Sequence, residues 1–349
     1  MLENLKEYFT DQHVVSTFAG VLVLIFLGYV LRKKNVFTSD TKEALTTILL
    51  KLAIPCLAFN SFMTEFNKGM ISVQIASFFI SAAAYALTVL ITRLVFHKLG
   101  KEKAQVVSVI SALGQLTLFA LPVLKALFDG NDAEAMITVN TVTINFRIMT
   151  YVYAYLIISG LKFDKQSIKS SVKTICLNPI VIAMFAGLVI YLLQDVVPSV
   201  TVGGKTHSAI RIDLYCPPLY SPIKTLASLV SPLAMLLTGV ICGGYDLKKA
   251  LKTKLYYLVA FIRTVLVPLM VLGLACATQF IFNAGFTEYS LTALVISFGA
   301  PVSAVVCAYS VKYQREEEFV SGTLVISVLF SLISVPMLGF LCRVVCGAF

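Results

Sequence analysis

One arginine stands out among the residues that could do chemistry, because it lies in the middle of a long apolar run. Arg147 occurs in TINFRIMTYVYAY, about midway between Ala135 and Leu161. An arginine at the centre of a membrane span costs on the order of 2.5–3.5 kcal/mol to insert. Such a residue faces a cavity or a partner and marks a substrate path by default. The acidic residues all fall in loops or at span edges, so we expect a carried anion to pair with this guanidinium through two parallel hydrogen bonds.

Two asparagines accompany Arg147 in its span. Asn140 precedes it by seven residues, which places both on one helix face two turns apart, whereas Asn145 faces elsewhere. The alternative to a substrate role for Arg147 is a structural one, in which it donates to exposed carbonyls of a broken helix. Arg93 and Arg263 lie nearer the cytoplasmic ends of their spans. We expect Arg93 to reach the membrane interface, and the role of Arg263 stays open.

Two other apolar segments contain helix-breaking residues. Gly114 and Pro122 interrupt SALGQLTLFALPVLKALF, and Gly299 and Pro301 interrupt SFGAPVSAVVCAY. Proline removes one intrahelical hydrogen bond, and in hydrocarbon the freed backbone group is tolerated only beside protein or a water-lined cavity. A broken helix in the middle of the membrane is therefore a candidate binding site.

Polar side chains near these breaks complete the candidate site. Gln115 and Thr117 could bind a ligand or satisfy the broken backbone, and the sequence favours neither role. Asn60 and Ser61 follow Pro55 in another span, where such residues more often pack helices together than bind ligands. The predicted substrate-binding residues are Asn60, Ser61, Gln115, Thr117, Pro122, Asn140, Asn145, Arg147, Pro301 and Ser303.

The composition indicates that these residues are held by membrane helices. The chain is 58% hydrophobic and 13% charged, whereas soluble domains are near 45–50% apolar and about 25% charged. A spanning helix needs roughly 20 apolar residues. The ten segments that meet this requirement are 14–31, 44–62, 71–96, 104–128, 135–161, 174–193, 223–242, 255–282, 289–311 and 319–345.

Lysine and arginine are concentrated in alternate loops between these segments. Because such loops stay in the cytoplasm, we expect both termini to lie outside. The same loops account for the net charge of +10 without a nucleic-acid partner. The long external loop, Gln194–Pro222, is expected to form a surface flap.

Prolines recur at matched separations along the chain. Pro55 and Pro232 are 177 positions apart, and Pro122 and Pro301 are 179 apart. This match predicts two related halves of five spans, the second inverted, which is a transporter architecture with a site near the midplane. The alternative is that proline is simply frequent in membrane helices. The predicted halves are 1–161 and 174–349, joined by a cytoplasmic linker at 162–173.

No pattern in the chain predicts an enzyme or a cofactor. The eight cysteines are scattered and the three histidines lie far apart, so we expect no metal site. Catalytic motifs and phosphate-binding glycine loops are not found in the sequence. A solute would therefore move passively or with an ion.

Four motifs carry a resemblance to a known family. KLAIPCLAF, LPVLKALFDG, GAPVSAVVCAYSVKY and SVLFSLISVPML, in this order and spacing, resemble the auxin efflux carrier family, whose bacterial members are often called malate permeases. The resemblance covers essentially the whole chain. It implies an all-α fold of ten transmembrane helices in two inverted five-helix repeats, with spans four and nine broken at Pro122 and Pro301 and crossing at mid-membrane.

The resemblance also implies a mechanism. Spans one, two, six and seven would form a scaffold, and spans three to five and eight to ten would move against it like an elevator, carrying organic anions such as auxins or dicarboxylates. The chain departs from the family's pattern at Gln115 and Val305, where the family has asparagine, and at Thr117 and Ala120, where it has glycine. These changes reshape the pocket, so the fold carries over better than the substrate.

Three functions follow from these observations. We expect a secondary carrier of a small organic anion in the plasma membrane, with the anion and the bilayer as partners; a homodimer is one arrangement that the sequence allows. A sodium-coupled carrier resembling the bile acid symporters is an alternative, because unwound carbonyls can coordinate sodium without a carboxylate. A membrane sensor that binds the anion without moving it is the other.

Overall fold

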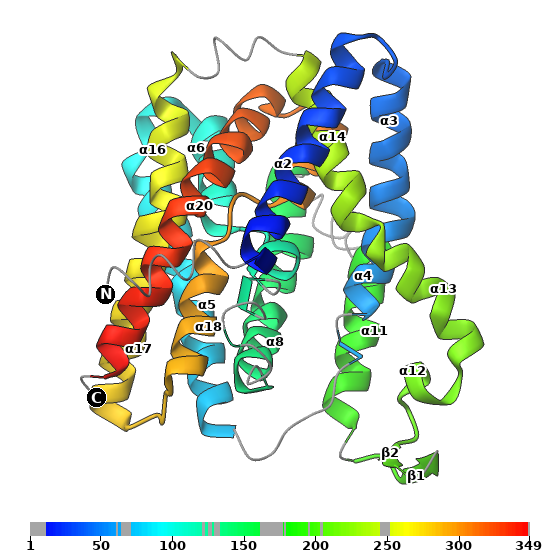
Figure 1. Ribbon diagram of the computed structural model, residues 1–349, viewed down its shortest axis with the longest axis vertical. Coiled ribbons are helices and arrows are strands. Elements are labelled where there is room, and N and C mark those ends of the chain that lie inside the picture. Colours follow the sequence, from blue (N-terminus) through cyan, green and yellow to red (C-terminus); the bar gives the residue numbers. More distant parts are fainter. Residues whose placement is uncertain are drawn as a thin grey trace, which may run out of the picture.

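The protein is built almost entirely from helices, as the computed structural model shows (Figure 1). Six helical runs within the described part of the chain are long and apolar enough to cross a membrane: Ser39–Asn60, Ser72–Val95, Thr141–Ser159, Pro217–Leu237, Lys254–Phe282 and Glu317–Cys346. The chain is therefore an all-α, multi-pass membrane protein. The structure describes residues 12–60, 62–63, 71–120, 123–124, 128, 133–160, 177, 179–194, 196–202, 205–244 and 252–347.

Helices lie over each of the ten apolar segments of the sequence. In the first half they are α2 (Gln12–Lys33), α3 (Ser39–Ile48), the π-helix η1 (Leu49–Ala53), α4 (Ile54–Asn60), α5 (Ile71–Val95), η3 (His97–Leu99), α6 (Lys101–Ala112), the π-helix η4 (Leu116–Ala120), α8 (Ala133–Ile148), the π-helix η5 (Met149–Ala154) and α9 (Tyr155–Ser159). In the second half they are α11 (Pro179–Leu193), α12 (Ile212–Tyr215), α13 (Pro217–Ser228), α14 (Val230–Gly244), α16 (Lys254–Phe261), the π-helix η6 (Ile262–Leu266), α17 (Val267–Phe282), α18 (Glu288–Gly299), α19 (Ala304–Tyr313) and α20 (Glu317–Cys346). The number of membrane crossings and the inverted relation of the halves stay predictions.

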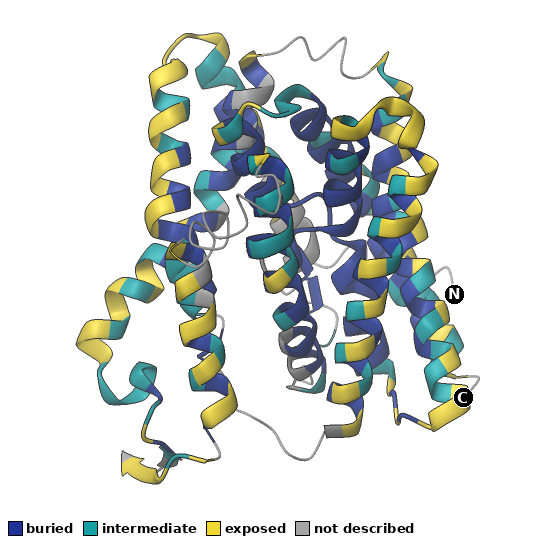
Figure 2. Cartoon of the chain, turned by 180° about the vertical axis from the view of Figure 1, so that it is seen from behind, coloured by how far each residue is buried: buried dark blue, intermediate teal, exposed yellow. Residues whose placement is uncertain are grey.

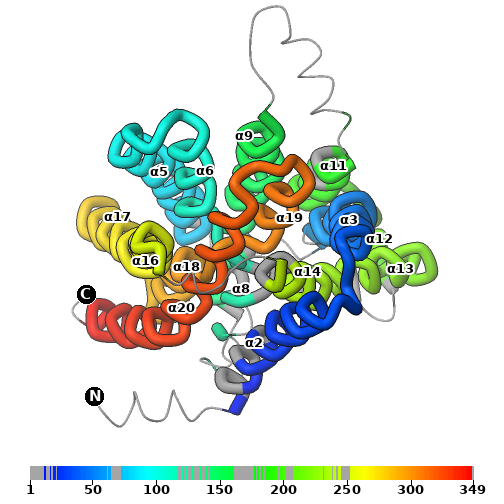
Figure 3. Tube along the Cα trace, turned by 90° about the horizontal axis from the view of Figure 1, so that it is seen from above, coloured from blue at the N-terminus to red at the C-terminus, as the bar shows by residue number. Residues whose placement is uncertain are grey.

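The helices pack in two groups, which lie on different sides of the molecule seen from above: α3, α11 and α13 on the right of Figure 3, and α5, α16 and α17 on the left. In the first helix group, α14 packs on α2, and α4 packs on α11 and α13. In the second helix group, α18 packs on α8, α17 and α20, and α5 packs on α6 and α8. Segments from both halves of the chain thus meet in each group.

The segment predicted as an external loop contains regular structure. Strands β1 (Ser199–Val202) and β2 (Lys205–Ser208) form an antiparallel hairpin, and the Tyr215 hydroxyl donates to carbonyls on both strands. Helix α13 already begins at Pro217, six residues before the predicted span, because proline fits the first turn of a helix, where its missing N–H costs nothing. The predicted flap is therefore a short, folded element.

Helices α18 and α19 lie at the centre of the molecule. Their residues are buried all round between Ser290 and Gly299 and between Ala304 and Val311, and they show dark blue in Figure 2. A helix that is apolar on every side is stable only in such a place. The break between these two helices consequently lies in the core, away from bulk water.

Candidate functional site

The two interrupted segments cross at their breaks. One break separates α6 from η4 and the other separates α18 from α19. Between them, Gly114 and Val302 pair as an isolated antiparallel β-bridge. The main-chain N–H of Gln115 donates to the Pro301 carbonyl at 2.7 Å. Main-chain hydrogen bonds thus join the break between α6 and η4 to the break between α18 and α19.

Other backbone groups freed by the breaks also have partners. The N–H of Ser303 donates to the Leu113 carbonyl at 3.0 Å. The N–H of Val302 donates to the Ser327 hydroxyl of α20, also at 3.0 Å. These bonds satisfy polar groups that would otherwise be costly in an apolar interior.

The break in the first segment falls at Gly114, one of the two helix-breaking residues that the sequence indicated. Pro122, the other, lies outside the described residues, so a break there stays a prediction. Glycine is required at this break because the two interrupted segments lie very close together there. A Cβ at position 114 would lie 2.8 Å from the Ala300 carbonyl oxygen and 1.9 Å from a guanidinium nitrogen of Arg263. Only glycine permits this approach. The paired positions, Gly114 and Val302, are 188 residues apart, so they do not follow the proline separation of 179.

Arg147 is buried beside the crossing, with 1% of its surface exposed. It lies in the last turn of α8, and its Nη1 donates to the Tyr151 hydroxyl at 3.1 Å. The guanidinium carbon is 5.9 Å from the centre of the Phe62 ring and 6.0 Å from that of Tyr151. At such distances the faces of aromatic rings stabilise a cation.

A small cavity of about 20 Å³ connects Arg147 with the crossing. It has room for about one water molecule, so the site is closed in this conformation. The Gln115 amide oxygen makes no hydrogen bond to any described residue, and its Nε2 lies 4.0 Å from the sulfur of Met235 on α14. The cavity is lined by Leu57, Gln115, Leu116, Phe146, Arg147, Tyr151, Ser303, Ala304 and Val305.

The structure thus brings three of the predicted site residues together: Gln115, Arg147 and Ser303. Two others make helix-packing contacts and do not line the cavity. Asn145 donates to the Phe78 carbonyl and the Ser81 hydroxyl of α5, both at 2.8 Å, and Asn60 accepts from the Tyr220 hydroxyl of α13. Pro301 contributes its carbonyl to the crossing. Ser61 and Pro122 and the side chains of Thr117 and Asn140 lie outside the described part.

Arg263 is the crossing residue whose role the sequence left open. It is 1% exposed and belongs to η6. Its Nε donates to the Ala300 carbonyl at 3.1 Å and its Nη1 to the Ala112 carbonyl at 3.2 Å. The sequence did contain a signal for this role: Arg263 lies in an apolar span and has no acidic residue near it in the sequence.

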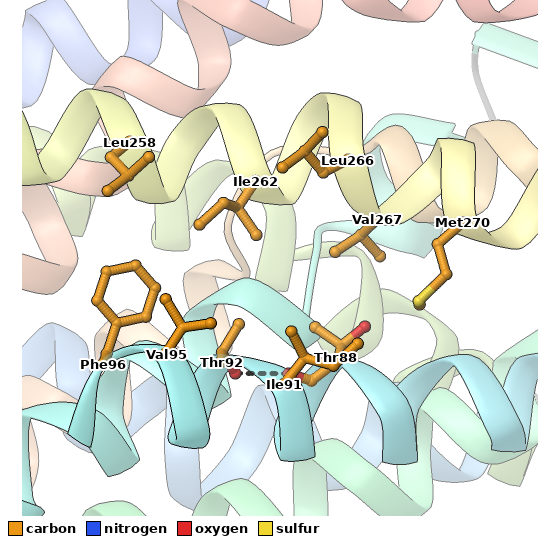
Figure 4. A pocket seen from close by; sticks show the side chains of 10 residues that line it. All are labelled: Thr88, Ile91, Thr92, Val95, Phe96, Leu258, Ile262, Leu266, Val267 and Met270. Carbon is orange, nitrogen blue, oxygen red and sulfur yellow. Dashed lines mark hydrogen bonds between the residues drawn. The ribbon is translucent and has the colours of Figure 1, made fainter.

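A larger groove of about 420 Å³ lies between α5 and the run α16–η6–α17 (Figure 4). It is lined by apolar side chains and two threonines, Thr88 and Thr92, whose hydroxyls donate to carbonyls of their own helix. Ile91 and Leu266 on its walls are exposed, as expected at a surface that faces lipid. The groove contains no charged side chain and offers nothing to an anion.

Broken helices that cross inside a multi-pass helical protein are typical of membrane transporters. A family model described as membrane transport protein matches residues 13–338. The chain belongs to this family, the auxin efflux carrier family. Its members are transporters rather than enzymes. Comparison with curated proteins gave no match.

Proposed function

We propose that the protein is a secondary transporter of small organic anions, chiefly carboxylates. The observation that carries this proposal is the place of Arg147, a fully buried guanidinium on the wall of a cavity at the crossing. A guanidinium binds a carboxylate through two parallel hydrogen bonds. Gln115 and the first turn of α19, at Ser303 and Ala304, line the same cavity. The N-terminal end of a helix carries about half a positive charge and would support the same anion.

The packing of the two helix groups supports an elevator motion. Among the residues that line the cavity, Leu57 of α4 belongs to the first helix group. The others lie in η4, α8, η5 and α19 or in the breaks next to η4 and α19. An anion bound here would lie at the boundary between a scaffold of spans one, two, six and seven and a moving unit of spans three to five and eight to ten. The proposed architecture for this mechanism is ten transmembrane helices in two inverted repeats. The proposed location is the plasma membrane, with both termini outside.

The test is the thermal stability of purified protein against a panel of mono- and dicarboxylates and indole acids. A ligand at 100 times its Kd stabilises a protein by about 2.7 kcal/mol, a readily measured shift. We expect one carboxylate class to raise the unfolding midpoint of the wild type. The shift should disappear in Arg147→Gln, which removes the charge.

Arg93→Gln is the matched control, because Arg93 is half-buried over the Tyr153 ring and outside the cavity. The Arg93→Gln variant should still show the rise in unfolding midpoint that the carboxylate causes in the wild type. A shift that persists in Arg147→Gln would place the anion elsewhere, and failure of Arg147→Gln to fold would assign Arg147 the structural role instead. Proteoliposomes loaded with the stabilising carboxylate then separate transport from sensing, because a sensor binds the anion but shows no counterflow.

A further inference from the structure

The C-terminal ends of two half-helices converge at the crossing. Helix α6 ends at Ala112, and α18 ends at Gly299 with Ala300 as its cap. Each helix end carries about half a negative charge on its free carbonyls. In transporters with broken helices, such ends and the unwound carbonyls beside them coordinate the coupling cation.

In this protein a side chain already occupies that position. The Arg263 guanidinium donates to one carbonyl from each of the two helix ends, Ala300 at 3.1 Å and Ala112 at 3.2 Å. A guanidinium nitrogen also lies against Gly114, where a Cβ would come within 1.9 Å. In the described part of the chain, both hydrogen bonds of Arg263 go to main-chain carbonyls and neither goes to a carboxylate. The charge that balances this buried cation is therefore that of the two helix ends.

The second buried arginine has a different environment. Arg147 donates to a tyrosine hydroxyl and lines the cavity together with the first turn of α19. The crossing thus has a negative side, where the C-terminal ends meet Arg263, and a side with positive character, where the N-terminal turn of α19 meets Arg147. A free cation would compete with Arg263 for the same carbonyls.

We propose that Arg263 is a resident cation that holds the crossing together in place of a bound metal ion. It is a positioning residue: it fixes both breaks relative to each other and so fixes the cavity on their other side. For the organic-anion transporter proposed above, on which this consequence rests, sodium would not be needed at the crossing.

The first experiment measures the unfolding midpoint of the wild-type protein in sodium, potassium or N-methyl-D-glucamine chloride at equal ionic strength. We expect the same midpoint in all three salts. A rise specific to sodium would overturn the proposal, because it would show that a free cation binds the folded protein. This measurement uses no substrate, so the outcome does not depend on whether an organic anion is carried.

The second experiment removes the resident cation. Arg263→Ala should lower the midpoint by several degrees, and guanidinium chloride at low millimolar concentration should restore part of the loss, whereas urea, a neutral molecule of similar shape, should not. Arg93→Ala is the control, since it removes a half-buried arginine that donates to the Ser108 hydroxyl and lies over the Tyr153 ring. Guanidinium should not raise the unfolding midpoint of this variant. Equal effects of guanidinium and urea on Arg263→Ala would contradict a role for the charge.

A second pair of variants keeps the proposal testable if Arg263→Ala does not fold. Arg263→Lys retains a positive charge, and Arg263→Gln retains hydrogen-bond donors without it. We expect the lysine variant to unfold at the higher temperature. A higher unfolding midpoint for Arg263→Gln than for Arg263→Lys would show that hydrogen bonding alone, without the charge, explains how Arg263 stabilises the crossing.

Discussion

At the scale of single residues, two arginines with the same burial differ in what they contact. Arg147 donates to a side-chain hydroxyl and borders the cavity, and Arg263 donates to main-chain carbonyls. The sequence identified the first because it lies in the middle of its span and near two asparagines. It left the second open, because position along a span does not say which backbone groups a side chain will meet across the fold.

Gly114 is the residue that the crossing tolerates least to change. In Gly114→Ala the new Cβ would lie 2.8 Å from the Ala300 carbonyl oxygen. The two interrupted segments must then separate, or Arg263 must move. Overpacking of this kind costs about 1–3 kcal/mol or more. We expect a lower unfolding midpoint and weaker carboxylate binding, both measured on the purified protein.

Gly273 provides the control for this change. A Cβ there meets nothing within 4 Å, and the residue lies inside α17. Alanine in a helix interior is favoured over glycine by roughly 0.5–1 kcal/mol, so Gly273→Ala should leave the midpoint unchanged or raise it. If both variants behave alike, the close approach at the crossing is not what requires glycine.

At the scale of elements, glycines decide how closely α2 and α14 pack. A Cβ at Gly28 would lie 2.3 Å from the Leu236 carbonyl oxygen, and a Cβ at Gly239 would lie 2.0 Å from the Ile25 carbonyl oxygen. Gly239 and Gly243 are four residues apart, which is the small-residue spacing of tightly packed membrane helices. This contact joins helices from the two halves of the chain.

Gly239→Ala is expected to push α2 and α14 apart and to destabilise the first helix group by about 1–3 kcal/mol. The unfolding midpoint measures the effect. Gly20→Ala is its counterpart, because Gly20 lies in α2 with nothing within 4 Å of its Cβ position. A midpoint that falls equally in the two variants would mean that the helix itself, and not the contact, is affected.

Hydropathy predicts where the helices are but not how they are wound. The apolar segments of the sequence coincide with helices, since each is long enough to need internal hydrogen bonding in lipid. In the described part of the chain, four π-helices interrupt them: η1, η4, η5 and η6. Arg263 lies in η6, and η5 begins two residues after Arg147. Such turns are common at functional sites and leave no mark in the apolar pattern. Glycine and proline do leave a mark in the sequence, and Gly114 was indicated there as one of the two helix-breaking residues of its segment.

At the scale of the whole molecule, an ion pair joins α3, which packs on α14 of the first helix group, to α20 of the second helix group. Lys42 of α3 lies 3.0 Å from Glu317, the first residue of α20, with 26% and 11% of their side chains exposed. Exposed pairs contribute about 0.2–1 kcal/mol, and we expect a contribution of this size from the Lys42–Glu317 pair. Both residues follow loops that the charge pattern assigns to the cytoplasm.

A charge exchange tests this link. Lys42→Glu should lower the unfolding midpoint, because it brings two like charges together. It should also change the rate of counterflow in proteoliposomes, because the proposed mechanism moves the two helix groups past each other. Adding Glu317→Lys should restore both values toward those of the wild type. A double variant no better than the single one would show that the pair does not couple the groups.

The packing of the helices into two groups cannot be derived from the residue pattern. Composition and positive charge predicted a multi-pass membrane protein, and the motifs predicted its family. Which spans pack together depends on contacts between segments far apart in the chain, such as those of α2 with α14 and α4 with α11. Periodicity within one helix does not record these contacts.

The main-chain bonds at the crossing have a consequence for how such carriers diversify. The bonds from Gln115 to Pro301 and from Ser303 to Leu113 use only backbone atoms, so they form whatever side chains these positions bear. Positions 115, 303 and 305 line the cavity and can therefore be exchanged while the framework that presents them stays intact. For the transporter proposed above, substitutions at these positions would therefore change which anion is bound, while the main-chain bonds of the crossing are retained.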